Sequence, residues 1–184
     1  NGFSTAPAYV GGDGVAFFSA SHPTVSGGIQ SNVAAASDLS EAALETIITN
    51  IQKIKDDRNI LIGSSAVSLH IPPDLWSTAD QILHSPGSTV AGGTGDGTYA
   101  QNNINAIRHM GMIPEGFFVN RRFTDTNNYY IKTDVPNGAK MFVRVPLQTK
   151  MEPDFDTGNL RFKARERYSF GFSDWRSYFG SQGS

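Results

Sequence analysis

The sequence predicts a mixed α+β fold with one unusually long β-strand near the carboxyl end. Three observations predict it: an amphipathic helix after Asp38, short apolar segments separated by Gly, Pro and Asn, and a period of two over residues 160–172. The length of 184 residues suits one domain, or a domain with a lobe. With 17% charged residues, 19 glycines and no cysteine, the chain is expected to be folded and loop-rich, without disulfides or thiolate metal sites.

The amino-terminal part predicts loops followed by the clearest helix of the chain. The first 36 residues are rich in turn formers, and residues 15–18 form a short buried strand candidate. Asp38 can cap the helix, and Glu41, three residues later, can complete a capping box. The helix ends near Lys55. Its apolar residues, spaced three and four apart, are Leu39, Ala43, Leu44, Ile47, Ile48, Ile51 and Ile54.

The middle of the chain predicts two short strands and a second helix. Residues 60–62 and 67–71 have strand patterns, and Pro73 is well suited to begin a helix that continues to about Leu83. The residues expected on its inward face are Leu75, Trp76, Ala79, Ile82 and Leu83. Residues 85–98 have little to bury, so we expect that segment to be mobile.

The second half of the chain is predicted to be β-rich. Residues 117–119 and 129–132 are strand candidates. Asn137-Gly138 indicates a tight turn, and residues 141–145 would return from it, so that 129–132 and 141–145 form a hairpin.

The most informative element is the segment 160–172. It predicts a strand about 43 Å long, since each residue of a strand advances ~3.3 Å, and typical strands have only about 5–6 residues. Such a strand suits an elongated, plate-like subunit. One face carries Leu160, Phe162, Ala164, Glu166, Tyr168, Phe170 and Phe172, and the other carries Arg161, Lys163, Arg165 and Arg167.

Two features of this strand indicate contacts. Glu166 interrupts the apolar face, and a buried carboxylate needs a cation, so we expect an arginine partner from another strand or another copy. The basic face could be a solvated surface, could pair with acids of a neighbouring copy, or could make weak, sequence-independent contact with nucleic acid phosphates. A net charge of −2 argues against a dedicated nucleic-acid binder.

Charge is unevenly distributed along the chain. Residues 1–100 have three basic and nine acidic residues, whereas residues 101–184 have twelve basic and eight acidic ones. Such asymmetry can orient copies of a protein against each other, although chance could also produce it. Apolar runs are far shorter than the ~18 residues of a membrane span, so no membrane contact is expected.

The sequence predicts no catalytic, metal-binding or cofactor-binding motif. His22, His70, His84 and His109 lack metal-site spacing, and the Gly92–Gly97 segment lacks the end of a phosphate loop. No Gly-x-Ser-x-Gly motif occurs, so the sequence predicts no enzyme and no catalytic residue. Glu152, Asp154, Asp156 and Gly158 resemble half of a calcium loop, but a solvated acidic turn is the favoured interpretation.

Several segments, taken in order, resemble a known family. They are Phe17-Phe18-Ser19 to His22-Pro23, Ser31-Asn32, DLSEAALE at 38–45, VSLHIPPDLWSTADQIL at 67–83 and FKARERYSFGFSDWRSYFGS at 162–181. Together they are similar to the C-terminal two-thirds or so of tailed-bacteriophage major capsid proteins of the Hong Kong 97 type. The carboxyl-terminal segment is the most specific, because a long strand with Arg165-Glu166-Arg167 is followed by an aromatic, glycine-containing end.

The resemblance implies an α+β subunit with a peripheral (P) and an axial (A) lobe. Residues 1–70 and 148–184, with the long strand, would belong to the P lobe, and residues 71–147 to the A lobe. The implied function is structural: pentamers and hexamers of this chain closing an icosahedral shell, the virion capsid, around double-stranded DNA. Arg161, Lys163, Arg165, Glu166, Arg167, Asp174 and Arg176 are the candidate subunit-contact residues.

Partners and alternatives follow from the same resemblance. The protein partners would be copies of the chain and other capsid, portal or decoration proteins. The packaged DNA would be contacted weakly. The chain would be synthesised in the host bacterial cytoplasm. The family's N-terminal arm, extended loop and spine helix have no counterpart here, so we expect a fragment of a longer protein. Alternatives are an encapsulin-like cellular cargo shell and a β-rich glycan-binding module that uses Trp76, Trp175 and the tyrosines.

Overall fold

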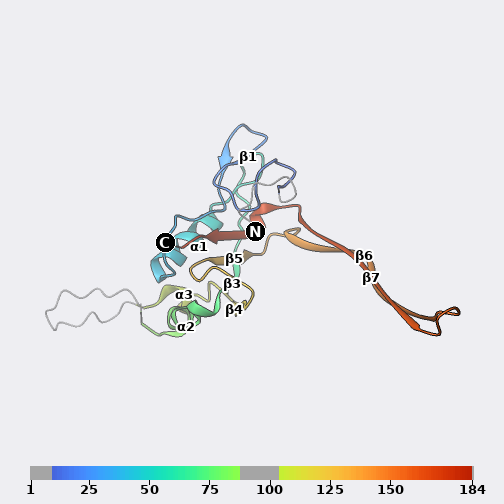
Figure 1. The fold of residues 1–184 in the computed structure, drawn as a ribbon. Coiled ribbons are helices and arrows are strands. Elements are labelled where there is room, and N and C mark those ends of the chain that lie inside the picture. The colour runs from blue at the N-terminus through green and yellow to red at the C-terminus, as the bar shows by residue number, and fades with distance from the viewer. Residues whose placement is uncertain (1–9, 88–103, 184) are drawn as a thin grey trace.

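In the computed structural model, a compact body surrounds a four-stranded sheet, and a long two-stranded hairpin projects from it (Figure 1). The structure describes residues 10–87 and 104–183. The strand order is β4-β3-β5-β8, in which β3 and β4 are parallel and the other neighbours are antiparallel. The strands are β3 (Ala66–Ile71), β4 (Phe117–Val119), β5 (Tyr129–Thr133) and β8 (Tyr178–Ser181). The strands predicted at 67–71, 117–119 and 129–132 are thus confirmed.

The predicted first helix is confirmed, but its start and its cap are corrected. Helix α1 (Glu41–Gln52) begins after Ser40, whose side chain accepts a hydrogen bond of 3.2 Å from the Ala43 backbone N–H. Ser40 therefore occupies the capping position expected for Asp38, because the chain adopts helical geometry only from Glu41. The buried residues of the helix are Glu41 and four apolar residues at the predicted spacing, Leu44, Ile47, Ile48 and Ile51. The helix ends at Gln52 rather than near Lys55.

The second predicted helix is also present, with one side chain placed differently. A 3₁₀ turn, η2 (Pro73–Leu75), leads into α2 (Trp76–His84), whose buried residues are Ala79, Ile82 and Leu83. Trp76 was expected to point inward but is 58% exposed, because it is the first residue of α2 and lies at the end of the buried face. A short helix, α3 (Ala106–His109), packs near α2.

Two predicted strands are wrong. Residues 15–18 include buried Ala16, Phe17 and Phe18, but they pair only through a single bridge between Val10 and Ala16. Residues 60–62 are exposed at the end of a turn, where Leu61 makes one bridge to Lys55. Short apolar runs can be buried or exposed without joining a sheet, since a strand also needs a partner of matching length. A small separate sheet is formed by β1 (His22–Pro23) and β2 (Ile29–Gln30).

The projecting hairpin consists of β6 (Ala139–Pro153) and β7 (Leu160–Phe172). The strand predicted at 160–172 is therefore confirmed over its full length. The predicted hairpin between 129–132 and 141–145 is wrong, because residues 141–145 pair with β7. Asn137, with φ of 66°, does make a turn, but its carbonyl accepts hydrogen bonds from the N–H groups of Ser173 and Asp174. This turn ties the two strands together where they leave the body.

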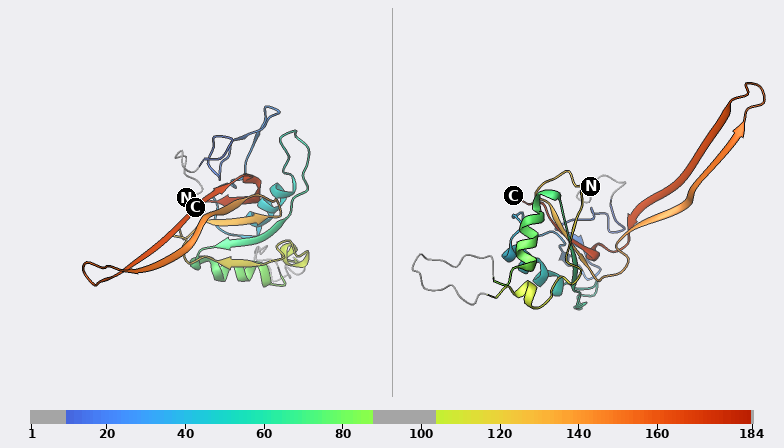
Figure 2. Two further views of the ribbon diagram at one scale, coloured as in Figure 1. Left: turned by 90° about the vertical axis from the view of Figure 1, so that its right-hand side faces the viewer. Right: turned by 90° about the horizontal axis from the view of Figure 1, so that it is seen from below.

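The core lies between the sheet and the helices, and the hairpin takes little part in it. Figure 2 shows the hairpin extending away from the body in both views. The segment 85–98, which was expected to be mobile, lies mostly outside the described residues, because residues 88–103 are not among them. Within the described ranges, every helix is too short or too polar to cross a membrane.

Candidate subunit-contact surface

One face of the β6–β7 hairpin is apolar and open to solvent. Cross-strand neighbours on this face are Met141 with Phe170, Val143 with Tyr168, and Met151 with Phe162. Phe170 is 74% exposed. The large apolar residues of this face that are at least half exposed are Met141, Val143, Met151, Leu160, Phe162, Tyr168 and Phe170. Large exposed apolar patches on proteins are typical of interaction sites, which makes this face the candidate contact surface.

The opposite face of the hairpin is basic. Arg161, Lys163, Arg165 and Arg167 alternate along β7, and all four are exposed. The hairpin, residues 139–172, has seven basic and four acidic side chains, whereas the rest of the chain has eight basic and thirteen acidic ones. The net charge is therefore +3 for the hairpin and −5 for the remainder. These opposite charges favour contact between the hairpin of one molecule and the body of another.

Most charges of the basic face have no ion-pair partner among the described residues. Arg161 pairs with Asp154 at 2.7 Å, close to the hairpin tip. Within residues 10–87 and 104–183, Lys163, Arg165 and Arg167 make no ion pair. Their charges are thus available to an external acidic partner.

Glu166 was expected to be buried beside an arginine, but in the single chain it is exposed. It makes no ion pair with any described residue, so no arginine of the same chain is its partner there. The carboxylate is solvated because both faces of the hairpin are open. The expectation of an arginine from another copy stays a prediction.

The pairing partner β6 was missed as a long strand by sequence reasoning. Its register with β7 shifts between Val143 and Val145 and again before Gln148. Pro146 lies in this interval, and a proline has no N–H to donate to the ladder. A signal was present, because apolar and polar residues alternate on both sides of Pro146, but the proline hides the continuity of the strand.

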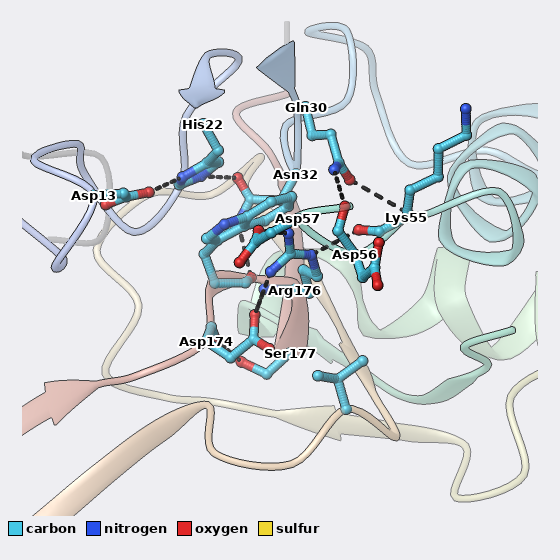
Figure 3. Close-up of polar contacts among 12 residues, drawn as sticks. Asp13, His22, Gln30, Asn32, Lys55, Asp56, Asp57, Asp174, Arg176 and Ser177 are labelled. Atoms are coloured by element: carbon cyan, nitrogen blue, oxygen red, sulfur yellow. Dashed lines mark hydrogen bonds and ion pairs between the residues drawn. The ribbon is translucent and has the colours of Figure 1, made fainter. Parts of the chain in front are cut away.

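Asp174 and Arg176, the last two candidate residues, lie at the root of the hairpin rather than along it. Asp174 caps the turn η3 (Trp175–Ser177) by accepting a 3.0 Å hydrogen bond from the Arg176 N–H. The Arg176 side chain is buried, and Figure 3 shows its polar contacts. Its guanidinium pairs with Asp57 at 2.6 Å and donates to the Lys55 carbonyl at 2.9 Å. Arg176 therefore fastens the hairpin root to the segment that follows α1.

The ring of Trp175 contacts the side chains of His22 and Arg176. The His22 ring stacks on it with centroids 4.1 Å apart and planes 4° apart, and the Arg176 guanidinium lies 4.5 Å from its ring centroid. Trp175 and Tyr129 are buried, so neither offers a face to a sugar. Trp76 and Tyr168, also considered for glycan binding, are more than half exposed.

A polar network continues from His22 into the core. Its Nδ1 lies 2.6 Å from an Asp13 carboxylate oxygen, and its Nε2 lies 3.1 Å from the Asn32 side-chain oxygen (Figure 3). The Asn32 amide nitrogen in turn donates to the carbonyls of Phe17, Trp175 and Tyr178. Sequence reasoning did not assign His22 or Asn32 this role, since nothing local marks a side chain that joins distant segments.

The described residues present no metal centre. In residues 10–87 and 104–183, no group of three or more His, Asp or Glu side chains converges as a metal site would require. Asp154, in the acidic turn, instead accepts hydrogen bonds from Thr157 and Arg161 of the same turn. His84 pairs with Asp80 one helical turn away, on the exposed face of α2. These contacts account for the candidate ligands as ordinary structural groups.

Comparison with known proteins gives a family. Residues 1–179 match the family described as phage capsid protein. No curated protein matches the chain. Among solved structures, the chain is similar to a virus-like particle from Pyrococcus furiosus, with 10% identity and a TM-score of 0.43 over 82% of this chain. It spans 56% of the length of that particle's chain. Because the family match extends over nearly all of the sequence, this chain belongs to the phage capsid protein family.

Proposed function

We propose that this chain is a structural subunit of an icosahedral capsid of a tailed phage, with a Hong Kong 97-like fold and no catalytic role. Pentamers and hexamers of the chain would close a shell around double-stranded DNA. Membership of the phage capsid protein family supports a shell subunit. The proposal locates the chain in the virion, after synthesis in the host bacterial cytoplasm.

The observation that carries the proposal is the projecting β6–β7 hairpin. It exposes an apolar face and a basic face, and apart from its root, where Phe172 packs on Phe17, both faces are open in the described chain. Burying apolar surface against a neighbour stabilises an assembly by about 25 cal/mol per Å² of apolar area removed from water. In an isolated subunit the hairpin buries little apolar surface and adds little stability, whereas in a shell it can bury that surface against a neighbouring copy. Arg161, Lys163, Arg165, Glu166 and Arg167 would make its polar contacts.

The division into lobes is part of the same proposal. Residues 1–70 and 148–184 would form the P lobe and residues 71–147 the A lobe. Asp174 and Arg176 would contribute to subunit contacts indirectly, by holding the hairpin root in position. The basic face could also contact packaged DNA weakly, and portal or decoration proteins would bind the assembled shell.

Electron microscopy of the purified protein tests this function. We expect closed shells of uniform diameter for the unchanged protein. The double variant Phe162→Ser, Phe170→Ser should lose the shells while keeping its thermal unfolding midpoint, because both side chains are exposed in the single chain. The matched control is Ile60→Ser, which replaces a residue of similar exposure outside the hairpin and should leave assembly intact. Shells formed equally well by the double variant would contradict the assigned role of the hairpin.

The contents of the particles distinguish the phage capsid from an encapsulin-like cargo shell. Particles isolated from the producing cells and treated with nuclease should retain long double-stranded DNA if the chain encloses a phage genome. Particles that instead hold a defined protein cargo and no DNA would favour the cargo shell.

A further inference from the structure

The tip of the hairpin presents a single aromatic side chain to solvent. Phe155, between the ends of β6 and β7, is 101% exposed, so its ring is not packed on any of the described residues. It stands between two carboxylates, Asp154 and Asp156. Exposed aromatics in monomers usually cover some apolar surface with one side of the ring, and this one covers none. An aromatic side chain that is fully hydrated is the largest apolar area a tip can offer to a partner.

The tip that carries Phe155 is well ordered by its own hydrogen bonds. The Asp154 N–H donates to the Asn159 carbonyl at 2.8 Å, and the Gly158 N–H donates to the Asp154 carbonyl at 2.9 Å. Gly158 has φ of 67°, a conformation that favours glycine. Arg161 and Thr157 both donate to one Asp154 oxygen at 2.7 Å. The tip is therefore preorganised, which lowers the entropy lost when Phe155 binds a partner.

The body contains a cavity of about 640 Å³, and half of the residues that line it have aromatic rings. Its aromatic lining residues are Phe17, Phe18, His70, Phe123, Tyr130 and Tyr178. Tyr130 contacts Phe18 and Phe123 with ring centroids 5.0 and 5.2 Å apart. The volume is within the range of about 300–1,000 Å³ that suits a ligand of several rings or a short peptide segment.

The ionisable rings of this cavity are held in their uncharged forms. Burial, reinforced by the nearby charge of Lys132 and opposed by Glu115, lowers the pKa of His70. Burial raises the pKa of Tyr130, with a contribution from Asp125, and raises that of Tyr178. At neutral pH these walls thus suit an apolar occupant.

The rim of the cavity offers polar groups that match the hairpin tip. Arg122 lines the cavity, is exposed, and makes no ion pair with any described residue. The Asn128 side-chain oxygen is buried there and accepts no hydrogen bond within the described chain. Asp125 is on the same rim, where it accepts a hydrogen bond from the Asn127 N–H at 3.0 Å. An incoming carboxylate and a backbone N–H would therefore find partners in Arg122 and Asn128.

The cavity and the tip of one chain cannot meet. The cavity is lined by Ala139, the first residue of β6, and is thus at the hairpin root. The tip lies the length of β7 away, about 43 Å for thirteen residues at ~3.3 Å each. Figure 2 shows the hairpin pointing away from the body. Only another copy can bring Phe155 to this cavity, and a contact between two different patches of one chain builds rings and shells.

We propose that Phe155 at the hairpin tip of one copy inserts into the aromatic cavity at the hairpin root of a second copy, where Asp156 pairs with Arg122. This contact rests on the proposed function, because it requires self-assembly. It adds a defined partner site to the shell: the occupant of the cavity is the tip segment 154–156 of a neighbouring chain.

Cysteine cross-linking tests the contact, since the natural chain has no cysteine. Phe155→Cys protein is mixed with an equal amount of Thr124→Cys protein, assembled, and treated with a short bifunctional maleimide. Thr124 lines the cavity and is exposed. We expect cross-linked dimers that contain one chain of each variant, at several times the yield obtained with Val25→Cys as the partner. Val25 is 90% exposed and does not line the cavity.

A second measurement uses assembly itself. Phe155→Ser should raise the protein concentration needed for assembly at least tenfold, whereas Phe155→Leu, which keeps an apolar side chain, should recover most of the assembly. Neither change should alter the thermal unfolding midpoint, because the Phe155 side chain is fully exposed.

The outcomes separate the two ideas. If the unchanged protein assembles but cross-linking does not exceed the Val25→Cys control, or Phe155→Ser assembles normally, the tip-to-cavity contact is overturned and the shell function stands. If the unchanged protein does not assemble under any condition, the proposed function fails, and the contact fails with it.

Discussion

One buried amide, Asn32, joins the amino-terminal loop 17–22 to the carboxyl-terminal segment 175–178. Its nitrogen donates to the carbonyls of Phe17, Trp175 and Tyr178, at 2.8, 3.1 and 3.0 Å. Its oxygen accepts from the Ser19 N–H at 2.9 Å and lies 3.1 Å from His22 Nε2. These groups are buried or partly buried, so the amide satisfies several polar atoms that have limited access to water. The hairpin root is thereby fixed to the amino-terminal loops.

Replacement of Asn32 by leucine should be strongly destabilising. The side chains have similar size, but leucine removes the hydrogen bonds to the Phe17 and Tyr178 carbonyls and the acceptor of the Ser19 N–H. The Trp175 carbonyl keeps the N–H of Tyr178 as a donor. Each buried group that loses its partner costs about 1–3 kcal/mol, so we expect a total loss of at least 3 kcal/mol in the free energy of unfolding. Urea unfolding of the purified protein measures it.

Asn50 provides the control for this change. It lies on the exposed face of α1, and Asn50→Leu should change stability by no more than about 0.5 kcal/mol. Equal effects at the two positions would contradict the role assigned to Asn32.

At the scale of elements, the cap of α1 shows how tertiary geometry selects among equivalent sequence signals. Asp38 and Ser40 are both good capping residues, and Asp38 has Glu41 at the spacing of a capping box. In the structure Leu39 is buried and the helix begins after Ser40. The helix was predictable from its period, whereas its first residue depended on how the preceding loop packs.

Ser40→Ala should therefore lower the free energy of unfolding by about 1 kcal/mol, the usual contribution of a side-chain cap. Ser40→Asp retains an acceptor and adds a favourable charge at the helix amino terminus, so it should keep the native stability. Thermal or urea unfolding distinguishes the two variants. No difference between alanine and aspartate at this position would show that the cap does not contribute.

The β6–β7 hairpin illustrates the limits of periodicity for strands. The alternation over 160–172 predicted β7 with the bounds that the structure has. It also predicted two different faces, and both exist. It did not predict that both faces are open or that β6 is the partner, because alternation records which side chains share a face and not what covers that face.

At the scale of the whole molecule, the separation of charge is the dominant feature. A hairpin of net charge +3 extends from a remainder of net charge −5. The sequence showed a difference in net charge between its two halves. Where these charges lie in space was decided by residues 139–172, which form the projecting hairpin. Attraction between unlike parts of different copies then favours a head-to-tail contact over a symmetric one.

Assembly should accordingly weaken as ionic strength rises. Raising sodium chloride from about 0.1 M to about 1 M shortens the Debye length from about 10 Å to about 3 Å, which screens exposed charge pairs. We expect a several-fold fall in the association constant, measured by light scattering or sedimentation.

The triple variant Lys163→Gln, Arg165→Gln, Arg167→Gln supplies the comparison. It should assemble less well at low salt and should lose most of the salt dependence. Association of the unchanged protein that is constant or stronger in salt would indicate that apolar burial alone drives assembly.

The sequence by itself determined the helix α1, the strand β7, the three short strands of the main sheet and the absence of familiar catalytic motifs. These are local properties: helical and strand periods, turn residues and motif spacing lie within a few residues of one another. Only the tertiary structure decided that residues 141–145 pair with β7, that Asn32 and Arg176 hold the hairpin root, and that an aromatic cavity lies there. Residues 141–145 pair with residues of β7 more than twenty positions away, and the contacts of Asn32 and Arg176 at the hairpin root join residues more than a hundred positions apart. Contacts at such ranges are set by packing of the whole chain rather than by any local pattern.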